Sequence, residues 1–112
     1  MELVRTSEFR SNYSELLRMG FKKAHLDNEI GTVADYLLSG RMMPEDYDDH
    51  KLEDNLSDFR ELHLEGNLLV LCRVPPKRVT LANIGTHSIL FRSRRRKQEK
   101  GNKRGRFWSV FF

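Results

Sequence analysis

Hydrophobic residues in the first third of the chain recur with a helical period. The first stripe has the spacing i, i+4, i+7, i+8 and consists of Phe9, Tyr13, Leu16 and Leu17. The second stripe also follows one face of a helix and consists of Leu26, Ile30, Val33 and Leu37. Thr6 or Ser7 suits the N-cap of the first helix, and Gly20 suits its end. The pattern predicts two helices, the second over residues 22–38, that pack as a hairpin on an apolar surface.

After Pro44 and an acidic stretch over residues 45–49, the hydrophobic period changes from that of a helix to that of a strand. Three segments alternate or are continuously apolar, namely residues 59–64, 68–74 and 78–84. In the first of them the leucines share one face, and Glu61 and His63 share the other. With a short strand at residues 3–5, we expect an α+β fold. It consists of a small antiparallel sheet of about four strands with the helical hairpin packed on one face.

Length and composition favour a single soluble domain. The 112 residues, of which 38% are hydrophobic and 32% charged, leave room for one modest core. No apolar run approaches the about 18 residues of a membrane span, and the N-terminus lacks the layout of a signal peptide. Cys72 is the single cysteine and lies in an apolar run, which excludes an intramolecular disulfide. We therefore expect a cytoplasmic protein with no membrane contact.

Charge divides the chain into two parts. Residues 92–112 contain nine basic residues and one acidic residue, a net charge of +8, whereas residues 1–91 contain eleven basic and fifteen acidic residues, a net charge of −4. The tail ends in a cluster of aromatic residues, Phe107, Trp108, Phe111 and Phe112. Basic and aromatic residues together suit single-stranded RNA, but the aromatics also suit closure over the sheet or an anchor for another protein. We expect one domain over residues 1–91 and a basic, aromatic C-terminal extension over residues 92–112.

Three of the four histidines, His50, His63 and His87, lie in the strand half of the chain, whereas His25 falls in the second helix as an expected surface residue. Their spacings match no metal-ligand motif and no second cysteine is present, so we expect no metal and no other cofactor. Converging histidines suit RNA cleavage. One group removes the proton of the ribose 2′-hydroxyl, a second protonates the leaving 5′-oxygen, and positive charge stabilises the phosphorane. Taken by themselves, three histidines in a domain of this size are more often incidental.

Three short motifs stand in order around these histidines. They are Asp49-His50-Lys51-Leu52, then Arg60-Glu61-Leu62-His63 with Gly66-Asn67-Leu68 after it, and Gly85-Thr86-His87-Ser88-Ile89-Leu90-Phe91. With the helical hairpin that precedes them, the segment from about residue 3 to residue 91 resembles the YafQ-type toxins of the RelE/ParE superfamily. The resemblance implies a small antiparallel sheet with two helices on one face, which agrees with the hydrophobic pattern.

The resemblance implies the toxin of a type II toxin–antitoxin system. Such a toxin is a ribosome-dependent mRNA endonuclease, or mRNA interferase, which cuts translated message in the decoding site without a metal and inhibits translation. Its implied partners are a cognate antitoxin protein and mRNA on the ribosome, beside the 16S ribosomal RNA. Operator DNA is bound only through the antitoxin. The acidic residues around position 50 suit either recruitment of basic antitoxin segments or simple solvation of a loop.

The resemblance also carries over individual residues. His50, His63 and His87 match the active-site histidines of the family, and we expect His87 to be the general acid. Whether His50 or His63 moves the 2′-hydroxyl proton, and which of them stabilises charge, stays open. The expected substrate-binding residues are Asn67, Phe91, Arg60 and Lys51, with Phe91 matching the aromatic residue of the closing motif.

Two features depart from the family pattern. Asn67 stands where the family usually has an aspartate, and an amide does not accept a proton as a carboxylate does. Glu61, two residues from His63 on the same strand face, is the expected catalytic replacement. Arg60 occupies a common basic position and either binds substrate or has a structural role. The extension beyond Arg92 has no counterpart in the family, so no function carries over to it.

Two other functions stay open from the sequence. One is a non-nuclease toxin on the same fold, such as a ParE-like topoisomerase inhibitor that acts by binding only. The three histidines argue against it, because such a toxin has no need of them. The other is a degenerate toxin that keeps antitoxin binding and has lost cleavage, a reading that Asn67 keeps open.

Overall fold

The computed structural model describes residues 2–52, 58–74 and 78–90. Its elements are, in chain order, β1 (Glu2–Arg5), α1 (Ser7–Arg18), α2 (Lys23–Ser39), the 3₁₀ helix η1 (Glu45–Tyr47), β2 (His50–Lys51), β3 (Phe59–Leu64), β4 (Leu68–Arg73) and β5 (Arg78–Gly85). The predicted role of Phe91 and the predicted extension over residues 92–112 lie outside the described residues.

Local sequence sets the ends of both helices. The Thr6 hydroxyl accepts a hydrogen bond from the Phe9 N–H at 3.0 Å, which satisfies one of the unpaired donors at the start of α1. Gly20, at a φ of 104°, follows the end of α1. Gly40 closes α2 at a φ of 74°, a left-handed conformation that glycine adopts without a steric penalty. Both predicted helices are confirmed. No helix of the described residues combines the length and the apolar character that a membrane crossing demands.

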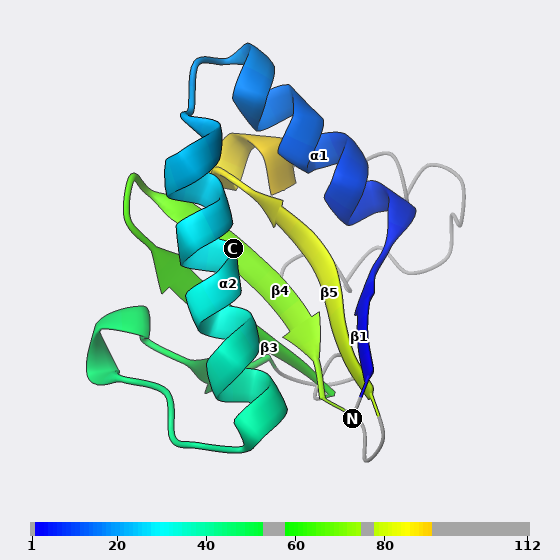
Figure 1. The fold of residues 1–112 in the computed structure, drawn as a ribbon, viewed down its shortest axis with the longest axis vertical. Helices are drawn as coiled ribbons and strands as arrows, with labels where there is room; N and C mark the ends of the chain where they lie inside the picture. The colour runs from blue at the N-terminus through cyan, green and yellow to red at the C-terminus, as the bar shows by residue number, and fades with distance from the viewer. Residues whose placement is uncertain (1, 53–57, 75–77, 91–112) are drawn as a thin grey trace.

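The strands form one five-stranded sheet in the order β1-β5-β4-β3-β2 (Figure 1). Strands β2 to β5 are antiparallel to their neighbours, whereas β1 runs parallel to β5, with Glu2 opposite Arg78. The sequence predicted about four strands, all antiparallel. The structure differs for two reasons. Strand β2 has only two residues, too few to show a hydrophobic period, and the pairing of β1 with β5 joins distant parts of the chain, which no local pattern records.

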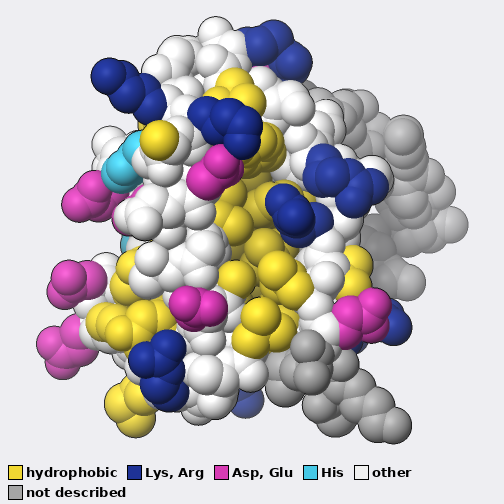
Figure 2. All heavy atoms as spheres, viewed as in Figure 1, with side chains coloured by type: hydrophobic (Ala, Val, Ile, Leu, Met, Phe, Trp, Pro, Cys, Tyr) yellow, Lys and Arg dark blue, Asp and Glu magenta, His cyan; other side chains and the backbone are white. Residues whose placement is uncertain are grey.

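The main core lies between the sheet and the two helices, which cover one face of it (Figure 1). Its fully buried side chains include Phe9, Leu16, Leu26 and Val33 from the helices and Leu62, Val70, Val79 and Ile84 from the sheet. Each such side chain contributes about 1.5 to 3 kcal/mol by leaving water. Figure 2 shows further hydrophobic side chains gathered in a band between the helices. The predicted stripes are therefore the faces that pack on the sheet.

The opposite face of the sheet is left open by α1 and α2. A small apolar cluster, made of Leu52 and Leu71 with Phe59 and Ala82 packed against them, covers part of this face. Residues paired across strands share a face, and His50 pairs with Glu61, which in turn pairs with Leu71. His63, two residues from Glu61 on β3, lies on the same face. The predicted split of β3 into a leucine face and a Glu61–His63 face is confirmed.

Candidate active site

His50 is held between two hydrogen-bond acceptors. Its Nε2 lies 3.2 Å from Glu61 Oε1 on the paired strand, and its Nδ1 lies 2.8 Å from the carbonyl oxygen of Asp48. A carbonyl oxygen only accepts, so Nδ1 is the donor to Asp48, and Nε2 forms an ion pair with the Glu61 carboxylate when the ring is protonated. The Glu61 side chain is almost fully buried beneath this contact. The arrangement therefore suits an imidazolium ion at His50, paired with a carboxylate that has little access to water.

His63 stands beside His50 but has different partners. The centroids of the two rings are 6.2 Å apart. His63 Nδ1 lies 3.7 Å from Asp48 Oδ2, too far for a hydrogen bond, and this buried nitrogen has no hydrogen-bond partner among the described residues. The side chain as a whole is 39% exposed. His63 is thus a partly exposed ring whose buried Nδ1 makes no hydrogen bond among the described residues.

An ion pair fixes the segment that presents His50. The Arg60 guanidinium donates to both carboxylate oxygens of Asp49, from Nε to Oδ1 at 3.0 Å and from Nη2 to Oδ2. This hydrogen bonding to Asp49 is the main reason that the pKa of Arg60 is raised above its ordinary value. The neighbouring Asp48 has a φ of 47°, a left-handed conformation that aspartate tolerates better than most residues. Arg60 therefore anchors Asp49, the residue that lies between Asp48 and His50.

His87 follows β5 at the same end of the sheet as His63. Strands β3 and β5 run in the same direction, because both are antiparallel to β4, and one row across the three strands is His63, Leu69 and Gly85. Two strand spacings, about 10 Å, separate β3 from β5. His87 follows Gly85 by two residues and is exposed. The topology therefore brings His87 to the end of the sheet where His63 lies.

A capped helical turn carries His87. Residues 87–90 are helical and follow β5 after Thr86. The Thr86 hydroxyl accepts from the Ile89 N–H at 3.2 Å, which caps the turn. A Cβ on Gly85 would lie 2.7 Å from Ile89 Cγ2 and 2.9 Å from Ile89 Cβ, closer than real Cβ contacts. The segment after β5 thus needs threonine at position 86 to cap the helical turn, and glycine at position 85 because a side chain there would collide with Ile89.

The backbone conformation of the turn between β3 and β4 explains why an asparagine occupies position 67. Asn67 has a φ of 61° and Gly66 a φ of 79°. Asparagine is one of the few residues with a side chain that adopt this left-handed conformation readily, so the turn itself explains the asparagine.

Lys51, another predicted substrate-binding residue, is exposed on β2 opposite Arg60. The structure therefore brings His50, Glu61 and His63 into direct proximity, and pairs Arg60 with Asp49.

Two sets of contacts were missed by sequence reasoning. Asp48 and Asp49 orient the site, and their position directly before His50 was the available signal. A buried amide pair also ties α1 to the end of β5: Asn12 Nδ2 donates to Asn83 Oδ1 at 2.6 Å. The sequence around Asn12 gives no sign of this hydrogen bond, because its partner Asn83 lies far away along the chain.

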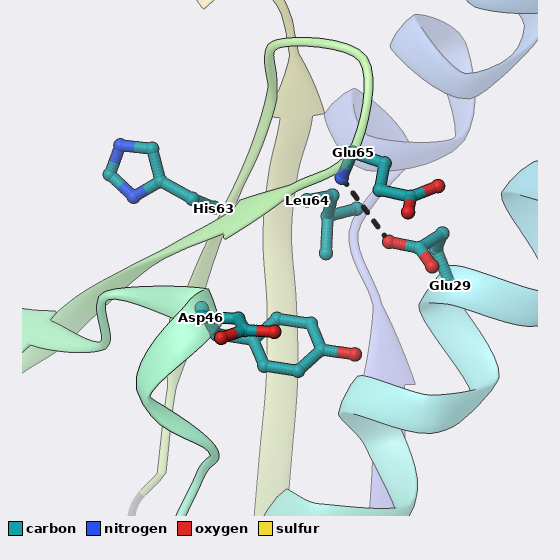
Figure 3. A pocket seen from close by; sticks show the side chains of 6 residues that line it. Glu29, Asp46, His63, Leu64 and Glu65 are labelled. Atoms are coloured by element: carbon teal, nitrogen blue, oxygen red, sulfur yellow. Dashed lines mark hydrogen bonds between the residues drawn. The ribbon is translucent and has the colours of Figure 1, made fainter.

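A pocket of about 260 Å³ adjoins this site at His63. It is lined by Glu29, Asp46, Tyr47, His63, Leu64 and Glu65. In Figure 3 the ring of His63 points away from the carboxylates of Glu29 and Glu65. His63 therefore belongs to the histidine site and also borders the pocket, whereas its ring is turned away from the two glutamates.

Comparison with known proteins identifies the family. Residues 1–92 match the family described as bacterial toxin of type II toxin-antitoxin system, YafQ. The mRNA interferase toxin YafQ of Escherichia coli K12 is 24% identical over 90 residues, which cover 80% of this chain and 98% of that protein. A metal-bound toxin from Helicobacter pylori is 27% identical with a TM-score of 0.67, covering 80% of this chain and 98% of its own.

The fold is also that of a toxin solved together with its antitoxin. The structure of the E. coli DinJ–YafQ toxin–antitoxin complex matches with a TM-score of 0.68 at 18% identity, over 80% of this chain and 96% of the matched chain. The family match spans the three candidate histidines and both helices, and it ends at residue 92. The chain belongs to the YafQ family of bacterial toxins of type II toxin–antitoxin systems.

Proposed function

We propose that this chain is an mRNA interferase, an endoribonuclease that cuts messenger RNA on the translating ribosome and is inhibited by a cognate antitoxin protein. Its relative in E. coli is named an mRNA interferase toxin, and YafQ forms a complex with DinJ. One observation carries the proposal: neighbouring histidines have complementary surroundings. His50 faces two acceptors, whereas His63 has a nitrogen without a hydrogen bond. Cleavage by the 2′-hydroxyl needs one cationic group and one proton acceptor in this arrangement.

The reaction divides the three histidines by role. The ribose 2′-oxygen attacks the adjacent phosphorus, and its proton passes to the exposed edge of the His63 ring, because Nδ1 of that ring is buried. The bond from phosphorus to the 5′-oxygen breaks, and that oxygen takes a proton from His87. His50, as an imidazolium, stabilises the negative charge on the phosphorane oxygens. With ring centroids 6.2 Å apart, His50 and His63 both reach one phosphodiester and its ribose. The products are a 2′,3′-cyclic phosphate and a 5′-hydroxyl.

Glu61 positions His50 in this scheme instead of accepting the proton itself. Its carboxylate is buried and lies 3.2 Å from His50 Nε2, so it balances the charge of the imidazolium. This role replaces the one expected from the sequence, where Glu61 stood in for the aspartate that Asn67 displaces. The amide of Asn67 then binds substrate by hydrogen bonding alone. Because His50 supplies the positive charge, the scheme proceeds without a metal.

The remaining predicted residues act around this centre. Arg60 acts through Asp49, because its guanidinium is already engaged there. Lys51 is exposed at the sheet edge, directly after His50 and opposite Arg60, and suits a phosphate of the RNA backbone. A toxin that acts by binding only, such as a topoisomerase inhibitor, has no use for the pairing of His50 with Glu61.

The test is cleavage of a defined mRNA by the full chain in a reconstituted translation system. The wild type is compared with His87→Gln, and Asp35→Asn, an exposed substitution on α2, is the matched control. We expect cleavage only on translated message, a loss of about 10² to 10⁴-fold in His87→Gln, and no loss in the control. Absence of cleavage by folded wild type, or full cleavage by His87→Gln, contradicts the proposal.

A further inference from the structure

A second group of ionisable side chains lies apart from the histidine site, between α2 and the turn that follows β3. His25 and Glu29 stand four residues apart on α2 and therefore project from one face of the helix on successive turns. Glu65 approaches them from the turn. One potential ligand atom from each of the three residues lies within 4.8 Å of the others. Helix and turn thus bring one imidazole and two carboxylates together.

Two direct contacts connect the group. His25 Nε2 lies 3.8 Å from Glu65 Oε1, and Glu29 Oε1 accepts a hydrogen bond from the Glu65 N–H at 3.3 Å. In Figure 3 the side chains of Glu29 and Glu65 approach each other across the gap between the helix and the turn. The backbone contact fixes the distance between the two carboxylate-bearing residues, so the cluster does not depend on two freely rotating side chains.

The hollow beside the group is strongly acidic. Glu29, Asp46 and Glu65 line it together with Tyr47, and no lysine or arginine is among its described lining residues. The pKa of Tyr47 is raised, first by burial and then by the neighbouring negative charges, those of Glu29, Asp46 and Glu65 among them. Carboxylates held this close repel one another unless a cation lies between them. The pocket is therefore electrostatically suited to a cation.

We propose that His25, Glu29 and Glu65 bind one divalent first-row transition-metal ion, with Zn²⁺ as the representative case. An imidazole nitrogen selects such an ion over Mg²⁺ or Ca²⁺, which prefer oxygen ligands alone. Metal–ligand bonds of about 2.0 to 2.2 Å place the ligand atoms of a tetrahedral site roughly 3 to 3.5 Å apart. Side-chain rotations close the remaining distance. Three protein ligands leave the fourth position to water.

The ion joins α2 to the turn that follows β3. Glu65 directly precedes the left-handed residues Gly66 and Asn67, and it lies two positions after His63. A metal bridge from α2 therefore holds the turn that flanks the histidine site, and it stabilises the folded chain by binding to it alone. The proposal does not depend on the nuclease activity, since its test measures metal binding.

The test titrates the metal-free full chain with Zn²⁺ in an isothermal calorimeter. We expect one ion per wild-type chain. His25→Gln and Glu29→Gln should each bind at least about tenfold more weakly, because even the loss of an outer-shell partner weakens metal sites by about 10 to 100-fold. Asp35→Asn, on an exposed part of the same helix, is the matched control and should bind as the wild type does. Circular dichroism checks that each variant is folded.

A second variant separates this site from the active site. His63→Gln should leave Zn²⁺ binding unchanged, since its ring points away from Glu29 and Glu65 (Figure 3). In NMR spectra, Mn²⁺ should broaden the amide signals of residues 25–29 and 64–66 before that of His50. Zn²⁺ binding that persists in His25→Gln and Glu29→Gln but is lost in His63→Gln overturns the proposal. Absence of stoichiometric binding by the wild type overturns it as well.

Discussion

Gly85→Ala is a substitution of one methyl group whose effect follows from the packing behind His87. The new Cβ would meet Ile89 Cγ2 at 2.7 Å and Ile89 Cβ at 2.9 Å. The Cβ of Ile89 is fixed by the capped turn over residues 87–90, and Ile89 is 3% exposed, so rotation of the side chain does not relieve the contact. Either the turn moves away from the sheet or β5 shifts. Overpacking of this kind costs about 1 to 3 kcal/mol of unfolding free energy.

Urea unfolding and mRNA cleavage measure the two consequences separately. Gly31→Ala is the matched control, because a Cβ there meets nothing within 4 Å and the residue lies inside α2. The control should gain about 1 kcal/mol, the difference in helix propensity between glycine and alanine. Gly85→Ala should lose about 1 to 3 kcal/mol. It should also cleave more slowly than its stability explains, because the turn that carries His87 has moved.

The outcome that refutes the reasoning is specific. If Gly85→Ala unfolds at the urea concentration of the wild type and cleaves at the same rate, Gly85 is not the residue that sets the position of the turn. A loss of stability with unchanged cleavage by the folded protein would show that the strain is absorbed by β5, and the link from Gly85 to His87 would fall.

Three other expectations rest on single contacts. Thr6→Ala removes the cap at the Phe9 N–H and should lower the unfolding free energy by about 1 kcal/mol in urea titrations; an unchanged midpoint would refute the cap. Asp49→Asn removes the charge partner of Arg60, whose side chain is 28% exposed, and should cost about 1 to 3 kcal/mol and slow cleavage, whereas wild-type values would deny Arg60 its anchoring role. Burial raises the pKa of the Cys72 thiol from 9.0 to about 12, so a thiol reagent at pH 8 should label it only after unfolding. Because the unfolded thiol ionises first, the stability from Cys72 is complete below pH 9 and is lost as the pH rises toward 12.

The helices and the three long strands were predictable because each buries one face. The stripes through Phe9 and Leu26 and the alternation in β3 record that burial directly in the sequence. Strand β2 was not predictable, because two residues are too few to show a period, and its existence depends on the pairing of His50 with Glu61. The parallel pairing of β1 with β5 is likewise a tertiary property.

The histidines of the site were predictable from their motifs, but their division of labour was not. That division depends on what each ring nitrogen faces, namely the Asp48 carbonyl and Glu61 for His50 and no hydrogen-bond partner among the described residues for His63 Nδ1. Arg60 was assigned to substrate because its position is basic, and only the structure shows the carboxylate that it binds. Contacts between side chains of different elements are set by the fold, so sequence spacing does not contain them.

The chemistry of the cut RNA ends tests the central claim most directly. An mRNA cleaved by the wild-type chain on translating ribosomes is mapped, and the new ends are identified by their reactivity toward phosphatase, polynucleotide kinase and ligase. Attack by the 2′-hydroxyl with histidine acid–base catalysis predicts a 2′,3′-cyclic phosphate, or the 3′-phosphate formed from it, and a 5′-hydroxyl. Ends with a 3′-hydroxyl and a 5′-phosphate would mean that water attacked the phosphorus, and the assignment of His63 and His87 would then be wrong.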